Sequence, residues 1–196
     1  MGVRVPLGTP CPFGDVSIRD KNVSNRNVPK ETFLSNLDHI FKNKEHNLEE
    51  KYMEEALKEA KKAFDKEEVP VGAVIVKDGK IIAKAYNERE TKKDSTSHAE
   101  IIAIKKACRK LNAWRLLDCE MYVTLEPCPM CAGALINSRI KKLYIGTPDE
   151  KTGACGSVLN LLEDYKFNHK IEVEKYILKD ECEKILKVFF KKLRKK

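Results

Sequence analysis

The feature that most constrains this chain is a pair of short motifs that lie far apart in the sequence. The first is Ser97-His98-Ala99-Glu100, and the second runs over residues 126–131 and contains Cys128 and Cys131. Two thiolates at this spacing on the first turn of a helix can bind one metal ion, and an imidazole adds a third ligand. The pattern therefore predicts a metal site at the amino ends of two adjacent helices.

The number of ligands favours a catalytic zinc site over a structural one. Structural zinc sites normally have four protein ligands, whereas catalytic sites keep one position for water. The other histidines, His39, His46 and His169, form no second ligand pair with a cysteine. Glu100 follows His98 closely enough to exchange protons with a metal-activated water. The alternative is a structural zinc knuckle, which gains nothing from Glu100 or from the missing fourth ligand.

Periodic apolar residues from Leu48 onward predict one α/β domain. We expect helices over residues 48–64, 98–111, 128–138 and 180–193, and strands over 71–76, 81–87, 120–125, 142–145 and 171–178. Asp78-Gly79 predicts a hairpin turn between the first two strands. Helices that alternate with strands after an opening hairpin predict a three-layer α/β/α domain around one mixed sheet.

Three local expectations concern where helices begin. Ser95, Thr96 or Ser97 is expected to cap the helix that begins at His98. Asp180 followed by Glu183 has the capping-box pattern for the last helix. A further short helix is expected over residues 158–162.

Residues 1–47 differ in composition from the remainder, residues 48–196, which we assign to one zinc-dependent domain. Proline and glycine are frequent over the first 30 residues, and apolar residues there are sparse and not periodic. This composition predicts a disordered extension without a catalytic role.

The charge of the chain fits a polyanionic partner. The formal net charge is +8, and residues 179–196 contribute eight Lys or Arg against three Asp or Glu. Solubility and compensation of the helix dipole are the alternative explanation for this basic end. Seven cysteines without an obvious pairing indicate a reducing compartment, the cytoplasm. No stretch has the length of a membrane-spanning helix, so no membrane partner is expected.

From about Leu48 to the end, the chain resembles bacterial tRNA-specific adenosine deaminases, which are members of the cytidine deaminase superfamily. The two zinc motifs alone would fit any deaminase of that superfamily. The residues most particular to the tRNA-acting branch are Asp149-Glu-Lys-Thr-Gly-Ala-Cys-Gly-Ser157, Asn168-His169 and the ending that contains Asp180 and Phe189-Phe190. The chain departs from the family at Tyr86, Ser95 and Cys155, none of which is expected to touch the chemistry.

The resemblance implies a cytidine-deaminase-like fold, a homodimer, and deamination of adenosine to inosine at the wobble position of a tRNA anticodon. It implies one Zn²⁺ per subunit, bound by His98, Cys128 and Cys131, with Glu100 as the catalytic proton shuttle. It also implies that the substrate, a tRNA anticodon stem-loop, contacts Asn87, Ala99, Asp149, Lys151 and Asn168. Asn87 corresponds to the family residue that hydrogen-bonds the purine.

Two alternative functions remain open. The first is the same chemistry on a free base or nucleoside of the guanine or cytosine type, which would need no basic terminal helix. The second is a zinc-stabilised RNA-binding protein without catalysis, in which Glu100 would be freely replaceable. Asp149, Lys151 and Asn168 can also serve only to shape their loops, because Asp and Asn commonly stabilise turns.

Overall fold

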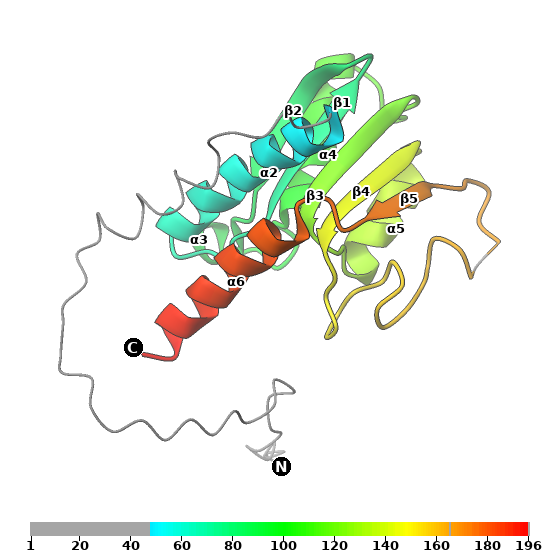
Figure 1. Cartoon of the computed structure of the whole chain (residues 1–196). Coiled ribbons are helices and arrows are strands. Elements are labelled where there is room, and N and C mark those ends of the chain that lie inside the picture. Colours follow the sequence, from blue (N-terminus) through cyan, green and yellow to red (C-terminus); the bar gives the residue numbers. More distant parts are fainter. Residues whose placement is uncertain (1–47, 165, 196) are drawn as a thin grey trace, which may run out of the picture. The chain divides into compact units, whose positions relative to one another are not determined.

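The computed structural model of the chain describes residues 48–164 and 166–195 (Figure 1). The disordered extension that the sequence predicts for residues 1–47 lies outside the described residues.

The centre of the domain is a five-stranded mixed sheet with the order β2-β1-β3-β4-β5. Its strands are β1 (Gly72–Lys77), β2 (Lys80–Tyr86), β3 (Cys119–Leu125), β4 (Lys142–Thr147) and β5 (Glu172–Lys175). Strand β1 runs antiparallel to β2 and β3, while β3, β4 and β5 are parallel to one another. The sheet is therefore mixed, as the sequence predicts.

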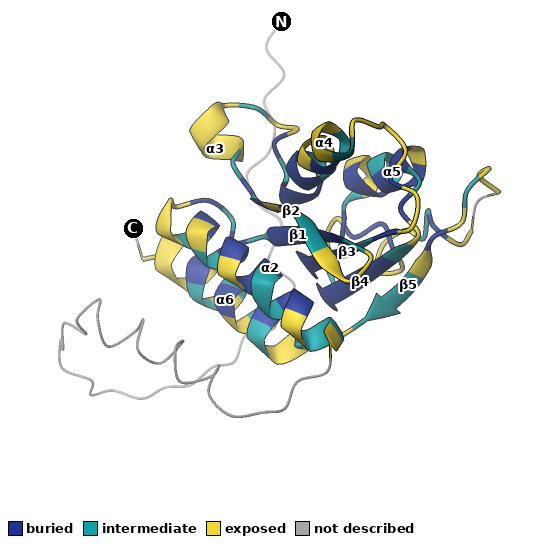
Figure 2. Cartoon of the chain, turned by 90° about the horizontal axis from the view of Figure 1, so that it is seen from above, coloured by how far each residue is buried: buried dark blue, intermediate teal, exposed yellow. Residues whose placement is uncertain are grey.

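Helices cover both faces of this sheet. They are α2 (Leu48–Asp65), the short α3 (Arg89–Lys92), α4 (Ala99–Leu111), α5 (Pro129–Ser138) and α6 (Lys179–Leu193). Figure 2 shows α2 and α6 on one face of the sheet and α4 and α5 on the other. This arrangement confirms the predicted three-layer α/β/α architecture.

Each face of the sheet has its own hydrophobic cluster, because side chains along a strand point alternately to opposite faces. Ala73 and Ile75 of β1 belong to the cluster under α4 and α5, whereas Val74 and Val76 belong to the cluster under α2 and α6. At the start of β1, helix α2 approaches so closely that a Cβ atom on Gly72 would lie 2.0 Å from the carbonyl oxygen of Ala56. Only glycine allows this approach.

The predicted hairpin turn between β1 and β2 is confirmed. Asp78 and Gly79 have φ angles of 49° and 69°, which is the left-handed backbone that a two-residue hairpin of this kind requires.

The expected cap of α4 is wrong. The residue at the amino-terminal cap is His98, and its side chain makes no capping hydrogen bond. The hydroxyl groups of Thr96 and Ser97 donate instead to the carboxylate of Asp94, at 2.7 and 2.8 Å. Because α4 begins at Ala99, none of the three expected residues occupies the cap position.

The capping box expected at Asp180 is also wrong, because the cap of α6 lies two residues earlier. Leu178 occupies the cap with a left-handed φ of 50°, and Asp180 lies inside the first turn. Glu183 forms ion pairs with Lys179 and Lys187 rather than with the cap.

Residues 158–162 form turns and an isolated bridge between Cys155 and Asn160 rather than the expected helix. The last strand, β5, is shorter than predicted.

Candidate active site

One edge of the sheet gathers the two motifs. Because β3 and β4 are parallel, Glu126 after β3 and Pro148 after β4 emerge at the same edge. Strand β1 runs the opposite way, so its first residue, Gly72, pairs with Tyr86 at the end of β2 at this edge. The topology thus brings four chain segments together beside the amino ends of α4 and α5.

The predicted metal ligands meet there. His98 is the amino-terminal cap of α4, Cys128 is the cap of α5, and Cys131 lies in the first turn of α5. The Sγ atoms of Cys128 and Cys131 lie 3.7 and 3.6 Å from Nδ1 of His98. Among the described residues, these three form the one group that could hold a metal ion, with all ligand atoms within 4.8 Å of one another.

The pKa values of the three side chains are shifted in different directions. Hydrogen bonding from Cys131, opposed by burial and aided by His98, lowers the pKa of Cys128 to about 4. The hydrogen bond to Cys128 and burial raise the pKa of Cys131, and the hydrogen bond to Cys128 also raises the pKa of His98. A thiolate at a helix amino end is also favoured by the helix dipole. Two sulfur donors and one imidazole nitrogen are a donor set that fits Zn²⁺.

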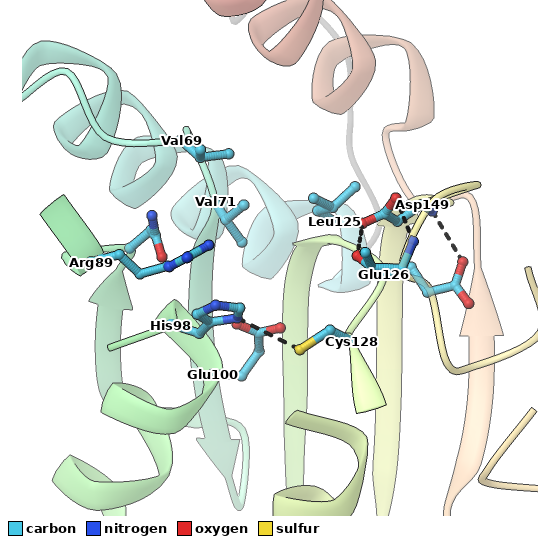
Figure 3. Close-up of a pocket in the computed structure, with 11 residues that line it drawn as sticks. Val69, Val71, Arg89, His98, Glu100, Leu125, Glu126, Cys128 and Asp149 are labelled. Atoms are coloured by element: carbon cyan, nitrogen blue, oxygen red, sulfur yellow. Dashed lines mark hydrogen bonds between the residues drawn. The ribbon is translucent and has the colours of Figure 1, made fainter. Parts of the chain in front are cut away.

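Glu100 lies beside this cluster, in the first turn of α4 (Figure 3). Its side chain is almost fully buried, with 3% exposed, and burial raises the pKa of its carboxyl group. A buried carboxyl group at the wall of a cavity, next to potential metal ligands, is typical of a proton-transferring group.

A cavity of about 150 Å³ opens in front of these residues (Figure 3). Its apolar lining comes from Val69, Val71 and Leu125. Its polar lining includes Asn87, Arg89, Glu126, Asp149 and Thr152, together with His98, Glu100 and Cys128 of the cluster. Apolar walls around a few convergent polar groups are typical of a small-ligand or nucleobase pocket.

Two of the predicted substrate residues line the cavity. Asn87 is buried there, and its Nδ2 donates to Oε2 of Glu68 at 3.2 Å. Asp149 also lines the cavity, but its carboxylate accepts hydrogen bonds from the backbone of Lys151 and Thr152 and from the Thr152 hydroxyl. Asp149 therefore organises its own turn, which agrees with the alternative that this loop residue serves a shaping role.

The other three predicted substrate residues do not line the cavity. Ala99 is fully buried at the start of α4, and Lys151 is exposed on its loop. Asn168 is exposed, and its Oδ1 accepts a hydrogen bond from Nη1 of Arg139 at 2.6 Å.

Three residues of the site do not follow from the sequence interpretation. Arg89 lines the cavity. Glu68 and Glu126 are buried, and they accept hydrogen bonds from segments on two sides of the cavity. Besides Asn87, Glu68 accepts hydrogen bonds from the backbone N–H groups of Glu90 and Thr91. The one signal for Glu126 is its place in the second motif, directly before Pro127.

The chain matches the MafB19-like deaminase family over residues 47–194. It is 53% identical over 148 residues to the tRNA-specific adenosine deaminase of Bacillus subtilis (strain 168), a match that covers 76% of this chain and 92% of that relative. The chain belongs to the tRNA-specific adenosine deaminase family. A second family member, from Aquifex aeolicus (strain VF5), is 53% identical over 145 residues, which are 74% of this chain and 95% of that protein.

A similar solved structure comes from biochemical and structural studies of A-to-I editing by tRNA:A34 deaminases at the wobble position of transfer RNA. It is 42% identical to this chain, the match covers 69% of this chain and 98% of that one, and the TM-score is 0.67. The predicted cytidine-deaminase-like fold is thereby confirmed. None of the helices in residues 48–164 and 166–195 is long and apolar enough to cross a membrane.

Proposed function

We propose that this protein catalyses the hydrolytic deamination of adenosine to inosine at the wobble position of a tRNA anticodon. The observation that carries the proposal is that His98, Cys128 and Cys131 converge beside the buried Glu100 at one cavity. The chain belongs to a family of tRNA adenosine deaminases, which supports the same conclusion. In the overall reaction, adenosine and water give inosine and ammonia.

Zinc is the metal we assign to the three ligands, with one ion per subunit. When bound, it supplies Lewis-acid chemistry that lowers the pKa of a water molecule to near neutrality. The two thiolates and the imidazole would hold the ion, one fewer than the four protein ligands of a structural zinc site.

Glu100 performs the proton transfers of the proposed reaction. Its carboxylate removes a proton from the attacking water and delivers it to the ring nitrogen next to the reacting carbon. It then takes the proton of the hydroxyl group that has been added to this carbon and passes it to the departing amine, which leaves as ammonia while the carbonyl group of inosine forms. The pKa that burial raises suits this task, because a group that both accepts and donates works best when its pKa approaches the working pH.

The walls of the cavity hold the base in this proposal. Val69, Val71 and Leu125 offer apolar surface to an adenine that has been flipped out of the anticodon loop. Asn87 orients the purine, and Glu68 fixes the Asn87 amide. Lys151 and Asn168 are proposed to meet the anticodon loop outside the cavity.

We further propose a homodimer in the cytoplasm. On α5, Met130 is 38% exposed, and a Cβ atom added to Gly133 would have no neighbour within 4 Å. Small residues on an open helix face allow a second helix to pack closely. Light scattering should show particles of twice 22.4 kDa at micromolar concentration.

The deciding experiment is incubation with an anticodon stem-loop that carries adenosine at the wobble position, followed by reverse transcription and sequencing. Inosine is then recorded as guanosine at that position. A matched stem-loop with its only loop adenosine moved by one position is the control. Guanine, cytosine and their nucleosides are assayed in parallel for ammonia release. Release from these small molecules without conversion of the RNA would overturn the proposal and favour the free-base alternative.

A further inference from the structure

Glu126 makes four hydrogen bonds to a loop that follows it by more than twenty residues. Its Oε1 accepts from the backbone N–H groups of Cys155 at 2.8 Å and Ser157 at 3.1 Å. Its Oε2 accepts from the N–H of Asp149 at 3.1 Å and from the hydroxyl of Ser157. We call residues 149–157 the substrate loop, because Asp149 and Thr152 of this loop line the cavity.

These hydrogen bonds saturate the carboxylate. Two carboxylate oxygens offer about four lone-pair sites, and the substrate loop fills all of them. Glu126 is also buried, with 3% of its surface exposed. Glu126 therefore lines the cavity, but its carboxylate has no free lone pair to accept a proton. It differs in this from Glu100, for which proton transfer is proposed.

The substrate loop is shaped to enclose this carboxylate. A Cβ atom on Gly153 would lie 2.6 Å from Cδ of Glu126 and 2.7 Å from its Oε2, so the loop can approach this closely only with glycine. Next to Gly153, the N–H of Ala154 donates to the carbonyl of Pro127 at 2.9 Å. The loop is thus attached to two consecutive residues that directly precede Cys128.

From this geometry we propose that Glu126 is a positioning residue, which fixes the substrate loop against the segment that carries Cys128. The proposal rests on the proposed function. Glu126 sets the distance between the wall that meets the RNA and the reacting centre. Its influence falls on RNA affinity more than on the chemical step, because His98 and Cys128 are held separately at the caps of α4 and α5.

The test is Glu126→Gln in the full-length protein. The amide keeps the size of the side chain, but its NH₂ group meets N–H and O–H donors where an acceptor is required. We expect KM for the anticodon stem-loop to rise about tenfold, as for the loss of one charge-assisted hydrogen bond. We expect kcat to change much less and metal content to stay at the wild-type value.

Glu150→Gln is the matched control, because Glu150 is exposed on the same loop and loses the same charge. Removal of a negative charge near RNA favours binding, so KM for this variant should stay constant or fall. Of the two substitutions, only Glu126→Gln is therefore expected to raise KM. Ser157→Ala removes one neutral donor to Glu126 and should raise KM by about threefold. If Glu126→Gln does not fold, the KM of Ser157→Ala tests the positioning role of Glu126 instead.

Hydrogen exchange supplies a readout independent of activity. In Glu126→Gln, the amides of Cys155 and Ser157 should lose protection, whereas amides of β3 should keep it. An unchanged KM in both Glu126→Gln and Ser157→Ala would overturn the inference. A loss of metal together with a collapse of kcat would also overturn it, because Glu126 would then act through the metal ligands. If the wild-type protein converts no RNA, the proposed function fails, and retained protection in Glu126→Gln is then the result that overturns the inference.

Discussion

The proposed metal centre and the substrate loop contribute to the same cavity, but they are built in different ways. The metal centre uses the ends of regular elements, with His98 and Cys128 at helix caps and Glu100 in the first turn of α4. The substrate loop consists of turns, and Glu126 holds it through a single buried carboxylate. The groups proposed to react are therefore held at the ends of packed helices, whereas the substrate loop is held by the polar contacts of Glu126 together with the buried side chains of Ala154 and Cys155.

From this difference we expect that substitutions can reduce the rate of deamination and the affinity for RNA separately. A change at the helix caps should remove activity entirely. A change at the periphery should alter affinity and leave the chemical step in place. The predictions below test this separation, beginning with the largest expected effect.

Cys128→Ala and Cys131→Ala should each lose the metal and all detectable deamination. A two-ligand site binds zinc poorly, and metal binding in such sites is coupled to folding, so thermal stability should fall as well. Metal analysis, an activity assay and thermal unfolding check this. Cys108→Ala is the control, because the Cys108 thiol lies outside the cluster and donates to the Trp114 carbonyl. One zinc per chain in either cluster variant would show that another residue ligates the metal.

Glu100→Gln should lower single-turnover deamination by about 10²–10⁴-fold, the usual contribution of a general acid–base group. Metal content and RNA affinity should persist, because the amide preserves the size of the side chain. Glu59→Gln is the control, since Glu59 is also buried but lies on α2, on the opposite face of the sheet. Near-normal turnover in Glu100→Gln would exclude the assigned role.

Removal of residues 191–196 should weaken RNA binding and flatten its salt dependence. For each phosphate of a duplex stem that the protein no longer neutralises, the slope of log affinity against log salt should decrease by about 0.9. The rate at saturating RNA should change little, because α6 lies on the face opposite α4 and α5 (Figure 2). Phe189 stays in place, since its ring packs against Phe64 at 5.8 Å between centroids.

The control for this truncation is the double substitution Lys105→Gln and Lys110→Gln, which removes exposed charge from α4. The competing view is that the basic end only maintains solubility. An unchanged KM and an unchanged salt slope in the truncated protein would support that view.

Deletion of residues 1–47 should have the smallest effect and leave kcat/KM for the stem-loop at the wild-type value. Apolar residues are sparse and not periodic over its first 30 residues, and no catalytic residue type stands at useful spacing in this segment. The truncated and full-length proteins are compared in the same assay, with circular dichroism to establish folding. A large loss of activity in a folded truncation would contradict the prediction.

The features that could be predicted from the sequence depend on short-range spacing. A continuous apolar run over residues 71–76 identifies β1, Asp78-Gly79 identifies its turn, and the two motifs identify the His98, Cys128 and Cys131 cluster. The cluster could be predicted because helix geometry alone brings Cys128 and Cys131 to the same side of a first turn. The mixed sheet followed from the order of these elements.

The features that could not be predicted depend on competition between distant or neighbouring partners. Ser97 does not cap α4, because the cap position falls on His98 and the Ser97 hydroxyl donates to Asp94. The expected helix over residues 158–162 does not form next to a segment whose amides donate to Glu126. A glutamate in a sequence carries no sign that it will be buried by a loop more than twenty residues away.

The parallel pairing of β3 with β4 has a consequence for how new specificities arise on this scaffold. The segment after β3 and the segment after β4 begin at the same edge of the sheet, but they are far apart in the sequence. Residues 148–164 can therefore be transplanted from a homologue without changing β3 or α5. Such a graft has to keep a glycine against Glu126, amide groups that surround its carboxylate, and the buried apolar side chains at Ala154, Cys155 and Leu162. Under the proposed function, the scaffold would then combine a fixed reactive part with an exchangeable recognition part.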